Sequence, residues 1–274
     1  MFLDPRNDAD KAIKVLCATS GVGNVGLDSK EIRSVYRMDF PPSILDIVQE
    51  SRRAGRVADG NPGDYSYHMY YSLESFIYLY ERAMDTTSES IDSNYWKEEI
   101  DDLFDVAKVV VLQEECIYVS IENHLGNPSS TLRSRSERPC GDLCPYCRGQ
   151  NSDTRIVPVF DKAGTRSVFF YLFNPPPSNI SIRRDAKPWT LDTLVEGVRT
   201  FPDATSLILA SRAKVGITPD QIKRIVFCFL VKGILGLNYH ESIKKAVFSL
   251  THSTENPREF KINEDVHWQG LQIK

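Results

Sequence analysis

The chain has 274 residues, of which 41% are hydrophobic and 26% are charged, and this size allows one or two domains. The composition is that of an ordinary soluble protein, because no apolar run is long enough to span a bilayer. The net charge of -4 argues against a protein dominated by nucleic-acid binding, so any contact with DNA has to come from local basic patches. The first residues lack the basic flank and apolar core of a signal peptide, which favours a reducing compartment with free thiols.

The first region predicts a strand, a glycine-rich loop and a second strand. Apolar residues 13–18 lead into glycines at positions 21, 23 and 26, and the loop ends in Asp28. The spacing G-x-G-x-x-G also suits a dinucleotide-binding turn, but that turn requires a helix to begin at the glycines. Residues 32–40 instead predict a strand that two prolines stop, so we disfavour a dinucleotide site.

A short amphipathic helix and an arginine-rich loop follow. Ser43, with Asp46 three residues later, is typical of a helix start, and Gly55 suits the helix end. The loop then presents Arg53 and Arg56, and an arginine so placed can neutralise charge that develops on a γ-phosphate. A solvated basic loop is the alternative.

The large side chains of Tyr65, Tyr67, Met69 and Tyr71 stand at alternate positions and predict a half-buried strand. The aromatic density of residues 65–80 favours core packing, with a platform for stacking of bases as the alternative.

The strongest chemical signal is a set of cysteines with metal-ligand spacing. Cys116 is followed by the knuckle Cys140, Cys144 and Cys147, which has the pattern C-x3-C-x2-C with turn-forming residues between the thiols. This pattern predicts a structural zinc site in which four thiolates surround one tetrahedral ion; free thiols or disulfides are the alternatives. The remaining cysteines, Cys17 and Cys228, lie in apolar runs and are expected to be small core residues.

The C-terminal region predicts strands at 157–160 and 168–173, a stiff proline-rich linker near 175–177, and helices at 191–199 and 204–212. A third helix should begin at Thr218–Pro219, and residues 234–237 and 246–250 predict a two-stranded hairpin. This order is that of a winged helix, or of a small α+β domain without a role in DNA binding. The candidate phosphate contacts are basic side chains of the helix and the hairpin: Lys223, Arg224, Lys244 and Lys245.

The order strand, glycine-rich loop, strand, helix and Arg-x-x-Arg in residues 10–70 resembles motifs V and VI of superfamily 2 helicases, most closely those of the RecQ family. The run Gln49-Glu50-Ser51-Arg52-Arg53-Ala54-Gly55-Arg56 carries most of the resemblance, although the family normally has glycine at position 52. The cysteine pattern is also similar to RecQ proteins, in which a helical hairpin and a four-cysteine platform follow the second RecA-like lobe.

This resemblance implies an α/β fold in four parts. Residues 1–84 would be part of a RecA-like helicase lobe of the P-loop NTPase type, and residues 85–150 a helical hairpin with a zinc-binding subdomain. Residues 151–180 would supply strands and the linker, and residues 181–274 a winged-helix domain.

The resemblance also implies a function, that of the C-terminal portion of an ATP-dependent 3′-to-5′ DNA helicase in recombination and repair. Arg53 and Arg56 would act on ATP held by a first lobe, Asp28 and Gln49 would help form that site, and the DNA backbone would contact two further side chains, Thr19 and Ser20. Zinc would be the resident metal, ATP and Mg would bind only with the first lobe, and DNA would be the partner, with no role for a membrane. The location would be the nucleus in a eukaryote and the cytoplasm otherwise.

The sequence contains no G-x-x-x-x-G-K-[ST] phosphate loop, so we expect no ATP turnover by this chain alone. The alternative function is a non-catalytic, zinc-stabilised module that binds DNA or a protein.

Overall fold

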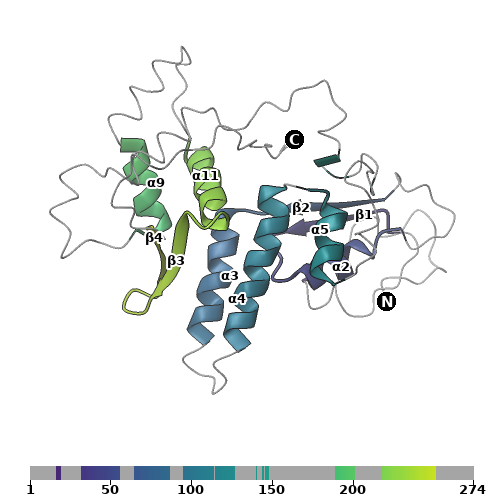
Figure 1. The fold of residues 1–274 in the computed structure, drawn as a ribbon, viewed down its shortest axis with the longest axis horizontal. Coiled ribbons are helices and arrows are strands. Elements are labelled where there is room, and N and C mark those ends of the chain that lie inside the picture. The colour runs from purple at the N-terminus through teal and green to yellow at the C-terminus, as the bar shows by residue number, and fades with distance from the viewer. Residues whose placement is uncertain are drawn as a thin grey trace, which may run out of the picture. The chain divides into compact units, whose positions relative to one another are not determined.

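A computed structural model of the chain has a mixed α/β fold with small sheets and several helices (Figure 1). It describes residues 17–19, 32–55, 65–86, 95–113, 115–126, 140, 144, 146–147, 189–200 and 218–250. The chain divides into two compact units, Met1–Ser72 and Leu73–Lys274. The predicted first domain, residues 1–84, extends past this division.

In its described residues, the first unit contains a two-stranded parallel sheet and one helix. Strand β1 (Ser34–Met38) pairs in parallel with β2 (Ser66–Tyr70), and Ser34 lies opposite Ser66. Parallel strands need a crossover connection, and helix α2 (Ile44–Ser51) lies within it. Ser43 caps this helix as predicted, because its side chain accepts the backbone N–H of Asp46.

A buried carboxylate ties the three elements of this unit together. Glu50 of α2 is 8% exposed, forms an ion pair with Arg37 of β1 and accepts a hydrogen bond of 2.9 Å from the hydroxyl of Tyr67 on β2. Burial, together with the neighbouring Glu50 carboxylate, raises the pKa of Tyr67 well above its usual range. The carboxylate is tolerated in the interior because both of its oxygens have partners.

Gly55 is required by its backbone and by its neighbour. Its φ is +76°, and a Cβ atom at this position would lie 2.8 Å from the ring of Tyr65. Helix α2 ends four residues earlier, at Ser51, so Gly55 shapes the turn after the helix rather than its last residue.

The part of the second unit that the structure describes is mainly helical. Helices α3 (Leu73–Thr86) and α4 (Tyr95–Ala107) lie side by side, and α11 (Pro219–Val231) contacts α3 (Figure 1). Phe76 of α3 is fully buried between Phe104 and Phe227, with ring centroids 5.2 and 5.1 Å away. These rings join three helices into one core.

Helix α11 begins at the predicted position. Thr218 and Gln221 form a reciprocal capping box, and Pro219 is the first helical residue. Helix α9 (Leu191–Thr200) packs on α11, and its residues Leu194 and Val198 are fully buried.

The predicted hairpin is confirmed. Strands β3 (Leu235–His240) and β4 (Lys245–Leu250) pair in antiparallel register, and Leu235 lies opposite Leu250. The backbone N–H of Phe248 donates to the carbonyl of Trp189 at 2.8 Å, so part of the outer edge of β4 is occupied. Among the helices of the described residues, none is long and apolar enough to cross a membrane.

Candidate metal centre

The first cysteine is positioned by a break between two helices. Helix α4 continues into the π-helix η3 (Lys108–Leu112), and Gln113 then adopts a left-handed conformation with φ of 47°. The side chain of Gln113 donates to the carbonyl of Val110 at 3.0 Å and closes the last turn. Helix α5 (Ile117–His124) begins directly after Cys116.

A helical hairpin was expected within residues 85–150, and this break separates α4 and η3 from α5 in that region. Helix α4 begins at Tyr95, and Cys116 is the N-cap of α5. The reason is physical: the wide π-turn and the left-handed Gln113 end the first helix and redirect the chain before the cysteine.

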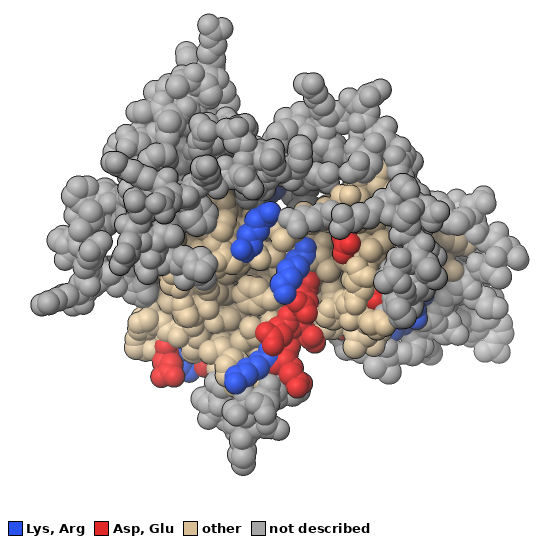
Figure 2. Space-filling view, in the orientation of Figure 1, with Lys and Arg blue, Asp and Glu red and all other residues tan. Residues whose placement is uncertain are grey.

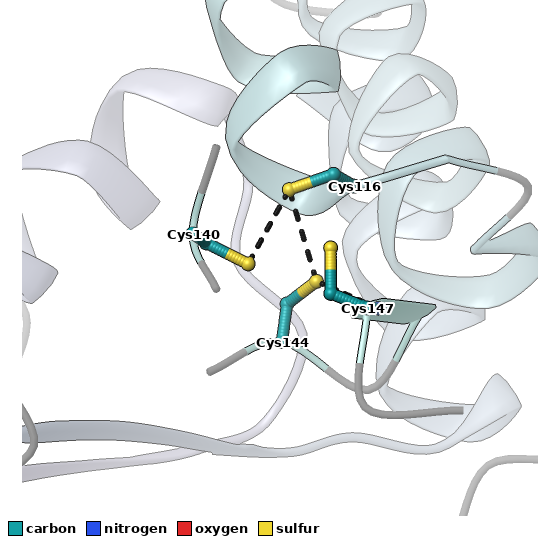
Figure 3. Close-up of side chains that lie close together, drawn as sticks. All are labelled: Cys116, Cys140, Cys144 and Cys147. Atoms are coloured by element: carbon teal, nitrogen blue, oxygen red, sulfur yellow. Dashed lines mark hydrogen bonds between the residues drawn. The ribbon is translucent and has the colours of Figure 1, made fainter. Parts of the chain in front are cut away.

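The four cysteines of the predicted zinc site lie close together (Figure 3). Their sulfur atoms all lie within 4.8 Å of one another, with 3.5 Å between Cys116 and Cys140 and 3.8 Å between Cys144 and Cys116. Figure 3 shows the side chains from the knuckle turned toward that of Cys116. All four side chains are buried, and Ile117, Val119 and Tyr146 pack around them.

The surroundings of the thiols act on their ionisation in both directions. Burial raises the pKa of Cys116 to about 11 and also raises the pKa of Cys147. Burial opposes ionisation of Cys144 as well, yet backbone hydrogen bonds from Cys147 and Ile117 lower the pKa of Cys144 below its ordinary value. The N–H of Cys147 lies 3.4 Å from the sulfur of Cys144, a contact typical of a sulfur that carries negative charge.

The geometry fits a tetrahedral metal ion such as zinc. Zinc–sulfur bonds of about 2.3 Å in a tetrahedron place the sulfur atoms about 3.8 Å apart, close to the distances between these thiols. Four protein ligands fill a tetrahedral shell, so the ion would have no open position for a substrate. The cluster can therefore hold a structural metal, and its chemistry is that of a cross-link rather than a catalyst.

The predicted ATP-site residues are described only in part. Asp28 and Arg56 lie outside the described residues, as does Ser20, which was expected to contact the DNA backbone. Gln49 is exposed on α2, and Arg53 is half-buried just after that helix. Thr19 is exposed, and so is Cys17, which was expected in the core; that expectation is wrong because residues 17–19 form no strand that would bury the thiol. Cys228 is buried in α11 as predicted.

The candidate DNA-contacting lysines lie on one part of the second unit. Lys223 belongs to α11, Lys244 to the turn of the β3–β4 hairpin and Lys245 to β4, while Arg224 is half-buried on α11. Each of the three lysines forms an ion pair with a carboxylate of α3. Sequence inspection did not identify these carboxylates as partners, because the pairs join segments far apart in the chain.

Acidic side chains also gather over α4 on the face shown in Figure 2, with basic side chains nearby. The exposed acids of this helix include Glu98, Asp101 and Asp102. This face therefore carries mixed charge rather than a broad basic surface.

Neither a protein-family model nor a curated protein matches this chain.

Proposed function

We propose that this chain is the C-terminal part of an ATP-dependent 3′-to-5′ DNA helicase of the RecQ type. In it, a zinc ion cross-links a helical hairpin to a cysteine knuckle. One observation carries the proposal: four buried thiols, contributed by the start of α5 and by a late knuckle, lie within 4.8 Å of one another. The same residues carry the resemblance of the cysteine pattern to that family.

The first unit supports the motor part of the proposal. Its parallel strands and crossover helix are compatible with a piece of a RecA-like lobe, and α2 leads directly into the arginine loop. In the proposed motor, Arg53 and Arg56 stabilise negative charge on the γ-phosphate of ATP bound to another lobe, with Asp28 and Gln49 beside them. Because the sequence has no phosphate loop, this chain alone would not hydrolyse ATP.

The C-terminal elements support a DNA-binding part. Helices α9 and α11 followed by the β3–β4 hairpin are compatible with a winged helix. Lys223, Arg224, Lys244 and Lys245 would then contact phosphates, and such contacts supply affinity without sequence preference.

A second candidate is a non-catalytic, zinc-stabilised module that binds DNA or a protein. The missing phosphate loop favours it, because neither arginine has a nucleotide to act on without a second lobe.

Co-expression with a RecA-like lobe that carries a phosphate loop tests the choice between the two. If the chain is part of a helicase, it should hydrolyse ATP together with the co-expressed lobe, and DNA should stimulate the hydrolysis. Arg56→Ala should abolish ATP turnover while ATP and DNA binding stay nearly intact. Arg52→Ala should have little effect on turnover. DNA binding without stimulation of ATP hydrolysis would favour the binding module.

A further inference from the structure

Three acidic residues of α3 lie on one stripe of the helix. Glu74, Glu81 and Asp85 are separated by seven and four residues, and such spacing places side chains on the same helical face. The rise of about 1.5 Å per residue separates them by about 10 and 6 Å along the axis. We call these three residues the acidic stripe.

The acidic stripe is paired with the candidate phosphate-binding lysines. Glu74 forms an ion pair with Lys223, and the resulting hydrogen bond raises the pKa of that lysine. The Nζ atom of Lys244 lies 3.4 Å from Asp85 Oδ1, and that of Lys245 lies 3.8 Å from Glu81 Oε2. Each acid of the stripe therefore faces one lysine.

The contact also involves the backbone of the hairpin. The N–H of Ala246 donates to Glu81 Oε1 at 2.8 Å, and the hydroxyl of Tyr239 donates to Asp85 Oδ1 at 3.3 Å. The neighbouring Tyr80 donates to the carbonyl of Leu237 at 3.1 Å. Helix α3 thus holds both strands of the hairpin.

Glu81 is the least exposed member of the stripe. Its side chain is only 19% exposed, whereas that of Asp85 is 55% exposed. Exposed ion pairs are weak because water and salt screen them, and partial burial with a backbone hydrogen bond strengthens the contact.

We propose that the acidic stripe of α3 is an autoinhibitory contact, which occupies Lys223, Lys244 and Lys245 and competes with nucleic-acid phosphates for them. This inference rests on the proposed DNA-binding function. A phosphate backbone has to displace the carboxylates before it gains these lysines, so the stripe lowers the affinity of the chain for DNA. A bound partner that neutralises or covers α3 would release the lysines together.

The test is binding of fluorescently labelled single-stranded DNA to the full zinc-loaded chain, measured by anisotropy at low and physiological salt. The variant E81Q/D85N removes two charges of the stripe, while the amide oxygen that replaces the Glu81 carboxylate can still accept the Ala246 N–H. The control D101N/D102N removes the same charge from α4. The variant K244A/K245A removes two of the proposed phosphate contacts.

We expect E81Q/D85N to bind about tenfold more tightly than D101N/D102N at low salt, with a smaller difference as salt rises. Addition of K244A/K245A to E81Q/D85N should abolish the gain.

Equal affinity of E81Q/D85N and the α4 control, with weaker binding by K244A/K245A, would overturn the autoinhibitory contact and leave the proposed DNA contacts standing. The K244A/K245A change could also leave DNA affinity unaltered, both in the unmodified chain and in E81Q/D85N. That result would overturn the proposed DNA contacts and the competition together. If E81Q/D85N does not fold, the single variant D85N, at the exposed end of the stripe, replaces it and is compared with D102N. The same outcomes then decide the question, with a smaller expected increase in DNA affinity.

Discussion

The sulfur atoms of Cys116 and Cys140 lie 3.5 Å apart although the two residues are 24 positions apart in the chain. Two neutral thiols gain little from such an approach, whereas a shared metal ion makes it strongly favourable. The contact between these two cysteines joins the start of α5 to the knuckle. The proposed zinc ion would stabilise this contact.

Loss of one ligand of the cluster should unfold the metal site. We expect Cys144→Ser to lose bound zinc and solubility together, because structural zinc binding contributes on the order of 10 kcal/mol to folding. Cys228→Ser is the matched control, since burial raises the pKa of that thiol to about 12 and it lies in α11, outside the cluster. Metal content and soluble yield of the two variants decide the matter; equal loss in both would count against a specific site.

The aromatic core of the second unit should depend on Phe76. Truncation to alanine removes a fully buried ring that contacts Phe104 and Phe227, so Phe76→Ala should cost about 3–5 kcal/mol of unfolding free energy. Tyr78→Ala, on the exposed side of the same helix with 62% of the residue accessible, should cost less than about 1 kcal/mol. Urea unfolding followed by helical circular dichroism measures both, and similar costs would mean that α3 faces the core differently.

Tyr67 should make the first unit sensitive to alkaline pH. Tyr67→Phe leaves one oxygen of Glu50 without its hydroxyl donor, so we expect a loss of about 1.5–3 kcal/mol at neutral pH. The pKa of Tyr67 is raised in the folded state, by burial and then by Glu50, so its contribution is fully present below the ordinary tyrosine pKa of about 10 and is lost as pH rises above it. Phenylalanine does not titrate, and the stability gap between the two proteins should therefore narrow in alkali.

Amide hydrogen exchange in β1 and β2, compared between the two proteins at each pH, measures this gap in the first unit alone. A gap that stays constant or widens above pH ~10 would show that Tyr67 is not held protonated by the fold.

Local signals in the sequence predicted the elements whose ends are set by neighbouring residues. Ser43 begins α2, and Thr218 and Pro219 begin α11. The hairpin was predicted with strands at 234–237 and 246–250, and its strands extend closer to the turn, over Leu235–His240 and Lys245–Leu250. These features depend on capping and turn chemistry within a few residues, so a single sequence is enough to find them.

Features that depend on distant neighbours were not predictable in this way. The π-helix before Cys116 changes the direction of the chain and so sets the position of this metal ligand. No pattern of residues in the sequence predicts the π-helix. The network of Arg37, Glu50 and Tyr67 joins three elements, and the pair of Glu81 with Ala246 spans 165 residues. The knuckle Cys140, Cys144 and Cys147 was predictable, because its metal-ligand spacing is itself a local pattern.

Elemental analysis of the chain purified without chelators tests whether the four-cysteine cluster holds one structural zinc ion, as we propose. We expect one zinc per chain, bound through Cys116, Cys140, Cys144 and Cys147, and lost together with folded structure when a strong chelator is added. A fully folded chain that contains no zinc or other tetrahedral metal would contradict it.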